Sequence, residues 1–227
     1  MKTLNHDHHL MYDPQFEHAA CGMGFITQID GHADHQLVEK ALTMLERMNH
    51  RGGTGAEPDT GDGAGILMAM PDRFFRQQMA NANLGLPEKG DYAVAQLFLP
   101  HEVQKRDAML SAVTAQIDQA GFPVLWTRLV PFVYENCGPG AQKSMPGFVQ
   151  IIMQRPADIA AGRPFEDQLY TLRRQLEHVF EHQSLAICSL SSQTIVYKGM
   201  LHAFQVGRFY PDLHDPAMES AICLIHS

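Results

Sequence analysis

The chain has 227 residues, 45% of them hydrophobic, and a formal net charge of −8 at pH 7, so it can bury a core as one domain or at most two. It contains no basic cluster and no apolar run of about 18 residues, which argues against nucleic-acid binding and against a membrane span. Its four cysteines are scattered without a CxxC pair, which argues against a zinc site or a disulfide framework and indicates a reducing, cytoplasmic setting.

Residues 1–20 are polar and rich in histidine and aspartate, and we interpret them as a flexible pre-segment. Three of the histidines (His6, His8 and His9) could bind a metal adventitiously, but terminal tracts of this kind are usually solvated. The segment ends in Ala19-Ala20, directly before Cys21. The apolar run that follows, residues 22–29, predicts a buried strand.

Cys21 has two interpretations from local sequence. Cleavage before it would give one residue with both a thiol and an α-amine, and the neutral amine, with a reference pKa of about 7.7–8.0, could take the proton of the thiol. Alternatively, Cys21 is a small buried residue at a strand start, as free cysteines usually are. The residues around it leave both interpretations open.

An amphipathic helix is predicted from His35, after Asp34 as its N-cap, and Gly52 and Gly53 are expected to end it. Glycine takes six of the seventeen positions of the loop over 49–65. The loop lacks the patterns of a phosphate loop, a dinucleotide fingerprint and an EF-hand, so it predicts a tight structural turn. Arg51 in this loop can either cap the carbonyls at the helix end or present its guanidinium to a carboxylate.

Strands and helices alternate through the remainder, which predicts a single α+β domain. The expected strands cover residues 66–70, 92–99, 124–133, 148–154 and 220–227, and the expected helices cover residues 71–82, 101–120 and 165–183. Two short β-rich runs, 185–190 and 194–197, are separated by Ser191-Ser192-Gln193, which is typical of a hairpin. Residues 208–213 predict an irregular segment.

Several motifs together resemble the class II glutamine amidotransferase domain at the amino terminus of bacterial glutamate synthase large chains. They are Cys21-Gly22-Met23-Gly24-Phe25, Met48-Asn49-His50-Arg51-Gly52-Gly53, Thr60-Gly61-Asp62-Gly63-Ala64-Gly65, Tyr197-Lys198-Gly199-Met200, Arg208-Phe209-Tyr210-Pro211-Asp212-Leu213 and Ile225-His226-Ser227. The resemblance covers nearly the whole chain. It implies the four-layer αββα sandwich of N-terminal-nucleophile hydrolases, with residues 1–20 as a propeptide and residues 21–227 as a partial domain, incomplete at its C-terminal end.

The resemblance also implies a function. Cys21 would be the catalytic nucleophile that hydrolyses glutamine to glutamate and ammonia, and Arg51 and Gly52 would bind and orient substrate beside it. No metal or cofactor is expected in this chain, because the FMN and the iron–sulfur cluster of glutamate synthase belong to the remainder of that enzyme. The expected partners are glutamine and the remaining synthase portion or the small subunit.

The sequence departs from the family after Ser227, where family members continue into Arg-Phe-Ser-Thr and later Asn-Gly-Glu. By resemblance these motifs supply a substrate-binding arginine and the oxyanion hole, whose donors typically contribute about 10²–10³ in rate. Two expectations therefore stand side by side. The chain is either the glutaminase part of an enzyme, with the activity of these 227 residues by themselves left open by the absent motifs, or a truncated domain that acts only as a binding or assembly module.

Overall fold

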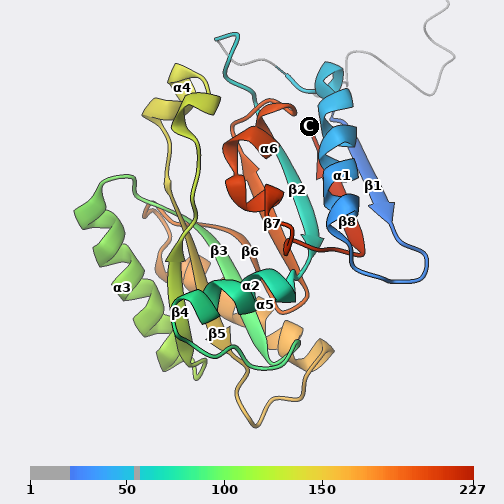
Figure 1. Cartoon of the computed structure of the whole chain (residues 1–227). Coiled ribbons are helices and arrows are strands. Elements are labelled where there is room, and N and C mark those ends of the chain that lie inside the picture. The colour runs from blue at the N-terminus through green and yellow to red at the C-terminus, as the bar shows by residue number, and fades with distance from the viewer. Residues whose placement is uncertain (1–20, 54–56) are drawn as a thin grey trace, which may run out of the picture.

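The computed structural model describes residues 21–53 and 57–227, in which two four-stranded antiparallel sheets carry helices (Figure 1). The first sheet has the order β1-β8-β2-β7, with bounds Met23–Thr27, Ile222–His226, Ala64–Ala69 and Thr194–Gly199. The second sheet has the order β4-β5-β3-β6, with bounds Val124–Leu129, Gly147–Gln154, Tyr92–Leu99 and Ala186–Ser191. The predicted α+β class is confirmed.

Six helices and three short 3₁₀ turns connect the strands in this part of the chain. The helices are α1 (His35–Arg47), α2 (Asp72–Asn81), α3 (Val103–Gln119), α4 (Pro139–Lys143), α5 (Arg163–Val179) and α6 (Gln205–Phe209). The turns are η3 (Asn49–Arg51), η4 (Tyr134–Asn136) and η5 (Pro211–His214). The segment 208–213, predicted to be irregular, therefore lies in the end of α6 and in η5.

Helix α1 forms where its apolar spacing predicts it. Asp34 is the N-cap, and its carboxylate accepts a hydrogen bond from the Gln36 backbone N–H at 3.0 Å, which satisfies one of the free donors of the first turn. The helix ends at Arg47, before the predicted glycines, and continues as the tighter turn η3. The α-helix therefore ends earlier than predicted, and residues 49–51 before Gly52 form a 3₁₀ turn.

Both faces of the second sheet are covered. Ala93 and Ala95 of β3 face a cluster that includes Phe165 of α5, whereas Val94 between them belongs to the other core cluster, with Phe74 of α2. All five side chains are at most 1% exposed. Alternate residues of one strand therefore enter two separate cores, as the period of two in a β-strand requires.

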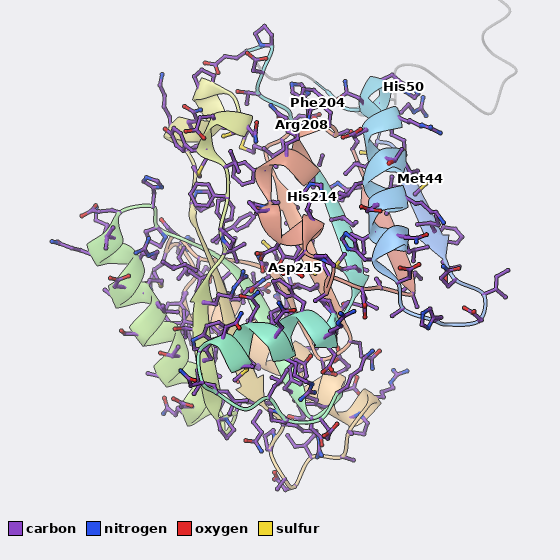
Figure 2. All side chains as sticks on the ribbon, in the orientation of Figure 1. Met44, His50, Phe204, Arg208, His214 and Asp215 are labelled. Atoms are coloured by element: carbon purple, nitrogen blue, oxygen red, sulfur yellow. The ribbon has the colours of Figure 1, made fainter. Side chains whose placement is uncertain are left out.

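The first sheet is covered on one face along β1 and β8, where α1 packs. At Gly24 a Cβ would lie 3.3 Å from Met44 Cε of α1, which is labelled in Figure 2. On the opposite face, Met23 and Phe25 are each 68% exposed and Ile222 is 43% exposed. The prediction of a buried first strand is therefore wrong, because within residues 21–53 and 57–227 β1 pairs only with β8, and α1 covers every second residue of β1.

The predicted hairpin over 185–197 is also wrong. Its strands, β6 and β7, belong to different sheets, and the link between them carries the chain from the second sheet to the first. Glu166 of α5 holds this link, because its carboxylate accepts hydrogen bonds from the Ser191 hydroxyl at 2.9 Å and from the Ser192 backbone N–H at 2.6 Å. A short polar link thus makes a corner rather than a hairpin turn.

A buried polar network ties the two sheets together. Arg128 of β4 donates two hydrogen bonds to the Asp212 carboxylate of η5, at 2.7 and 2.6 Å, and these side chains are only 9% and 5% exposed. Tyr197 of β7 donates to Asp212 at 3.0 Å and accepts from Gln150 of β5 at 3.0 Å. Burial and the Asp212 carboxylate raise the pKa of Tyr197 well above its ordinary value, so the phenol remains a donor.

Helices α3 and α5 are each buried along one side. Val113 and Ile117 of α3 are buried, but Val103 at its start is exposed. Leu169, Leu172 and Leu176 form the buried side of α5, whereas Val179, the last residue of this helix, is exposed. Within residues 21–53 and 57–227, no helix combines the length and apolarity needed to cross a bilayer.

Candidate active site

Cys21 lies at one end of the first sheet, just outside the pairing of β1 with β8. The Gly22 N–H donates to the Ser227 carbonyl at 2.6 Å, and the Ser227 N–H donates to the Gly22 carbonyl at 2.9 Å. This pair extends the ladder by one step beyond Met23 and His226. Cys21 follows on the outside of the last hydrogen-bonded pair, close to the C-terminus marked beside α1 in Figure 1.

Cys21 is the exposed member of the four cysteines, and Cys137, Cys188 and Cys223 are buried. Burial raises the pKa of all three buried thiols, to about 12 for Cys188 and about 11 for Cys223. They therefore remain protonated near neutral pH and are poor nucleophiles. The interpretation of Cys21 as a buried apolar residue is wrong, and an accessible thiol is left at the sheet end.

Arg51 lies against the backbone that follows Cys21. A Cβ at Gly22 would lie 2.8 Å from Arg51 Cβ and 2.6 Å from Met48 Cε, so glycine is needed for η3 to approach β1 this closely. Within the described residues, the Arg51 guanidinium makes no hydrogen bond to the carbonyls at the helix end, so capping finds no support here. Figure 2 shows its neighbour His50 at the same end of α1.

Gly52 brings the loop to the same place. A Cβ on Gly52 would lie 2.5 Å from Ser227 Oγ, so its backbone contacts the residue that pairs with Gly22. The next residue, Gly53, donates from its N–H to the Asp62 carboxylate at 3.0 Å. The fold thus brings the three predicted site residues together around the Gly22–Ser227 pair. The Asp62 carboxylate holds the adjacent part of the glycine loop through its hydrogen bond with Gly53.

Local sequence patterns do not identify Ser227, Asp62 or His226 as neighbours of this site. His226 pairs with Met23 on one side, and on the other its Nε2 lies 2.8 Å from the Cβ position of Gly65. Burial, together with the positive charge of Lys198, lowers the pKa of His226, so its imidazole is neutral at pH 7. These neighbours are identified by the register of β1, β8 and β2, which is known only from the folded structure.

Among the described residues, no group of three or more His, Cys, Asp or Glu side chains is arranged to hold a metal ion. The histidines at positions 6, 8 and 9 and the whole pre-segment over 1–20 lie outside the described residues. The exposed thiol of Cys21 can act as a nucleophile. An arginine and backbone groups of the adjacent loop lie beside it.

A sequence model of the class-II glutamine amidotransferases matches residues 21–227. The chain belongs to this family. It is 43% identical over 219 residues to the glutamate synthase [NADPH] large chain of Bacillus subtilis, covering 96% of this chain and 14% of that protein. It is 36% identical to the corresponding large chain of Azospirillum brasilense, over 95% of this chain and 14% of the relative, and 36% identical to ferredoxin-dependent glutamate synthase 2 of Synechocystis, over 92% and 13%.

These similarities confirm the family that the motifs indicate, including its N-terminal-nucleophile fold type. The chain spans 14% of the length of the Bacillus subtilis relative, so it corresponds to a small part of a much larger protein. The family match begins at Cys21 itself. Membership of an amidotransferase family favours an enzyme over a domain that serves only as a binding or assembly module.

Proposed function

We propose that this amidotransferase domain is the glutaminase part of a glutamate synthase and that Cys21 is its nucleophile. The observation that carries the proposal is the position of Cys21, which is exposed at the open end of β1 while the other three cysteines are buried. The family match that starts at the same residue supports it. The substrate is glutamine and the products are glutamate and ammonia.

The chemistry begins with removal of residues 1–20, which leaves Cys21 with a free α-amine. The neutral amine takes the thiol proton, and the thiolate attacks the carbon of the glutamine side-chain amide. The tetrahedral intermediate collapses as the ammonium form of the amine returns the proton to the leaving nitrogen, and ammonia departs. Water then attacks the thioester, releases glutamate and restores the thiol.

We assign to Arg51 and Gly52 the role of positioning the substrate beside the terminal amine and thiol of Cys21. The Arg51 side chain starts beside Gly22, the first peptide unit after the nucleophile. A guanidinium close to the terminal amine disfavours a second positive charge, and so favours the neutral amine that acts as base. Gly52, in contact with Ser227, places backbone groups at the sheet end where a substrate would lie.

The remainder of the synthase is the proposed consumer of the ammonia, which would be combined there with 2-oxoglutarate. FMN and the iron–sulfur cluster are assigned to that remainder and not to residues 21–227. The remaining synthase portion, or the small subunit, is accordingly the proposed protein partner, and the cytoplasm is the proposed location. The names of the relatives, all glutamate synthases, support the assignment of this domain to a glutamate synthase.

Release of glutamate from glutamine by the purified chain tests the proposal. We expect release by the wild type and its loss in Cys21→Ala, with retention in the matched control Cys137→Ala, which removes a buried thiol that none of the proposed steps uses. Equal release by the wild type and Cys21→Ala would contradict the assignment of the nucleophile. No release by any of the three proteins would contradict the proposal that these residues form a working glutaminase.

A further inference from the structure

A cavity that Cys21 does not line lies where four connections of the chain converge. It has a volume of about 610 Å³ and lies between the loop around α4, the β3–α3 connection, the start of β6 and the residues after β7. Figure 1 shows α4 at the edge of the molecule opposite α1. This volume is within the range of about 300–1,000 Å³ that small-molecule sites occupy. None of the residues assigned to the glutaminase reaction lines it.

The floor of the cavity is aromatic and rigid. Phe98, Phe148 and Phe209 line it, and Phe148 makes edge-to-face contacts with both others, at ring-centroid distances of 5.2 and 5.6 Å. Met145 and Leu201, both buried against the protein, add apolar walls. Aromatic floors of this kind bind the apolar body of a ligand, since burying apolar surface is favourable and non-directional.

The walls are held in place before any ligand arrives. The Glu57 carboxylate accepts a hydrogen bond from the Gly140 N–H at 2.7 Å, which fixes α4 to the glycine loop. Gln142 donates from its side chain to the Cys137 carbonyl at 2.9 Å and to the Tyr134 carbonyl at 3.2 Å. A preformed wall reduces the ordering cost of binding.

The rim of the cavity carries a net positive charge. Among the residues that line it, Glu102 is the one carboxylate, and Lys105 neutralises it with an ammonium-to-oxygen distance of 2.7 Å. Lys143 is therefore the uncompensated charge at the mouth. This is unusual in a chain with a net charge of −8, and it complements an anionic group on a ligand whose apolar body lies on the aromatic floor.

We infer that this cavity binds a small organic anion with an aromatic or aliphatic body, held by the phenylalanine floor and by Lys143. The site goes beyond the proposed glutaminase function, because Cys21, Arg51 and Gly52 do not line it. The 227-residue chain itself can be tested with a defined probe, 8-anilinonaphthalene-1-sulfonate, whose fluorescence rises in apolar surroundings. Its uncharged counterpart, N-phenyl-1-naphthylamine, separates the contribution of charge from that of apolar burial.

We expect saturable binding of the sulfonate at one site per chain, and binding of the uncharged probe weakened at least ~10-fold. Lys143→Glu should weaken sulfonate binding by a similar factor, since it reverses the charge at the mouth. Lys89→Glu, an exposed lysine on the loop before β3, is the matched control and should leave binding unchanged. Equal affinity for the two probes, or no effect of Lys143→Glu, would overturn the anion assignment.

A filled cavity tests the location independently of charge. Ala186 lines the cavity but is exposed, so Ala186→Trp inserts bulk with little cost to the core and should abolish binding. The exposed face of β1 is the competing place for an apolar probe, and Phe25→Ser removes its largest side chain. Binding that survives Ala186→Trp and disappears in Phe25→Ser would overturn the proposed site, as would an absence of saturable binding to the wild type.

Discussion

The two sheets of this domain differ in how completely they are covered. The second sheet has helices α3 and α5 on one face and the common core on the other, and its central strand β3 is almost wholly buried. The first sheet leaves Met23 and Phe25 of its edge strand 68% exposed, and Cys21 lies at the end of that strand. The second sheet is thus closed on both faces, whereas the candidate chemistry lies at the open border of the first. A reactive thiol requires the access that a closed core denies.

Asp212→Ala should have the largest effect on stability. It leaves the buried Arg128 guanidinium without its carboxylate and removes the acceptor of Tyr197, and breaking a buried pair in this way costs about 3–5 kcal/mol. Urea unfolding followed by circular dichroism measures the loss. Asp107→Ala, at an exposed carboxylate of α3, is the matched control and should change stability by less than about 0.5 kcal/mol. A small loss in Asp212→Ala would mean that the network does not hold the sheets together.

A matched pair of phenylalanine substitutions tests the comparison of the sheets directly. Phe165→Ala removes a fully buried ring between α5 and the second sheet and should cost about 3–5 kcal/mol in the free energy of unfolding. Phe25→Ala removes a mostly exposed ring from the first sheet and should cost less than about 0.5 kcal/mol. Similar losses in the two variants, measured by the same urea titration, would show that the open face of β1 is covered in solution.

Gly22→Ala should have an intermediate effect, concentrated at the candidate site. Its new Cβ would enter the space of Arg51 and Met48, and overpacking of this kind costs about 1–3 kcal/mol. We also expect slower alkylation of Cys21 by a glutamine analogue, because Arg51 is displaced. Gly85→Ala, where a Cβ meets nothing within 4 Å, is the control for both measurements. Unchanged labelling in Gly22→Ala would contradict the positioning role of Arg51.

His226→Gln should have the smallest effect, visible only as a change in pH dependence. The pKa of His226 is lowered in the folded chain by burial and by Lys198, so the unfolded chain binds the proton more readily. The contribution of His226 to stability is fully present above its pKa in the unfolded chain, about 6.5. It is lost as the pH falls through the lower pKa that His226 has in the folded chain. Urea midpoints between about pH 7.5 and about pH 5 should therefore fall less steeply in the variant. Identical slopes would contradict the assigned pKa direction.

Local patterns are enough to predict α1 and its Asp34 cap, since a helix is specified by contacts within a few residues. They fail at the link from β6 to β7, because Ser191-Ser192-Gln193 has the composition of a hairpin turn. The link instead passes between the two sheets, held by hydrogen bonds to Glu166 of α5. Local patterns fail again at β1, whose apolar sequence does not show that, in the part of the chain that the structure describes, no helix covers one of its faces. Burial depends on the partner, which local sequence does not name.

The candidate site divides in the same way. Cys21 and Arg51 stand in short motifs whose resemblance to the family predicts a nucleophile and its neighbour, so the sequence alone proposes them as site residues. Ser227, which pairs with Gly22 and contacts Gly52, is about two hundred residues away along the chain and comes into view only through the register of β1 and β8. Contacts that depend on strand register have no local signature.

The most direct test of the account is the intact mass of the purified chain before and after incubation with the glutamine analogue 6-diazo-5-oxo-norleucine. We expect a chain that begins at Cys21 and gains one covalent adduct, with no adduct in Cys21→Ala. A chain that still begins at Met1 and remains unlabelled, or an adduct that persists in Cys21→Ala, would contradict the assignment of Cys21 as the nucleophile at the open end of the first sheet.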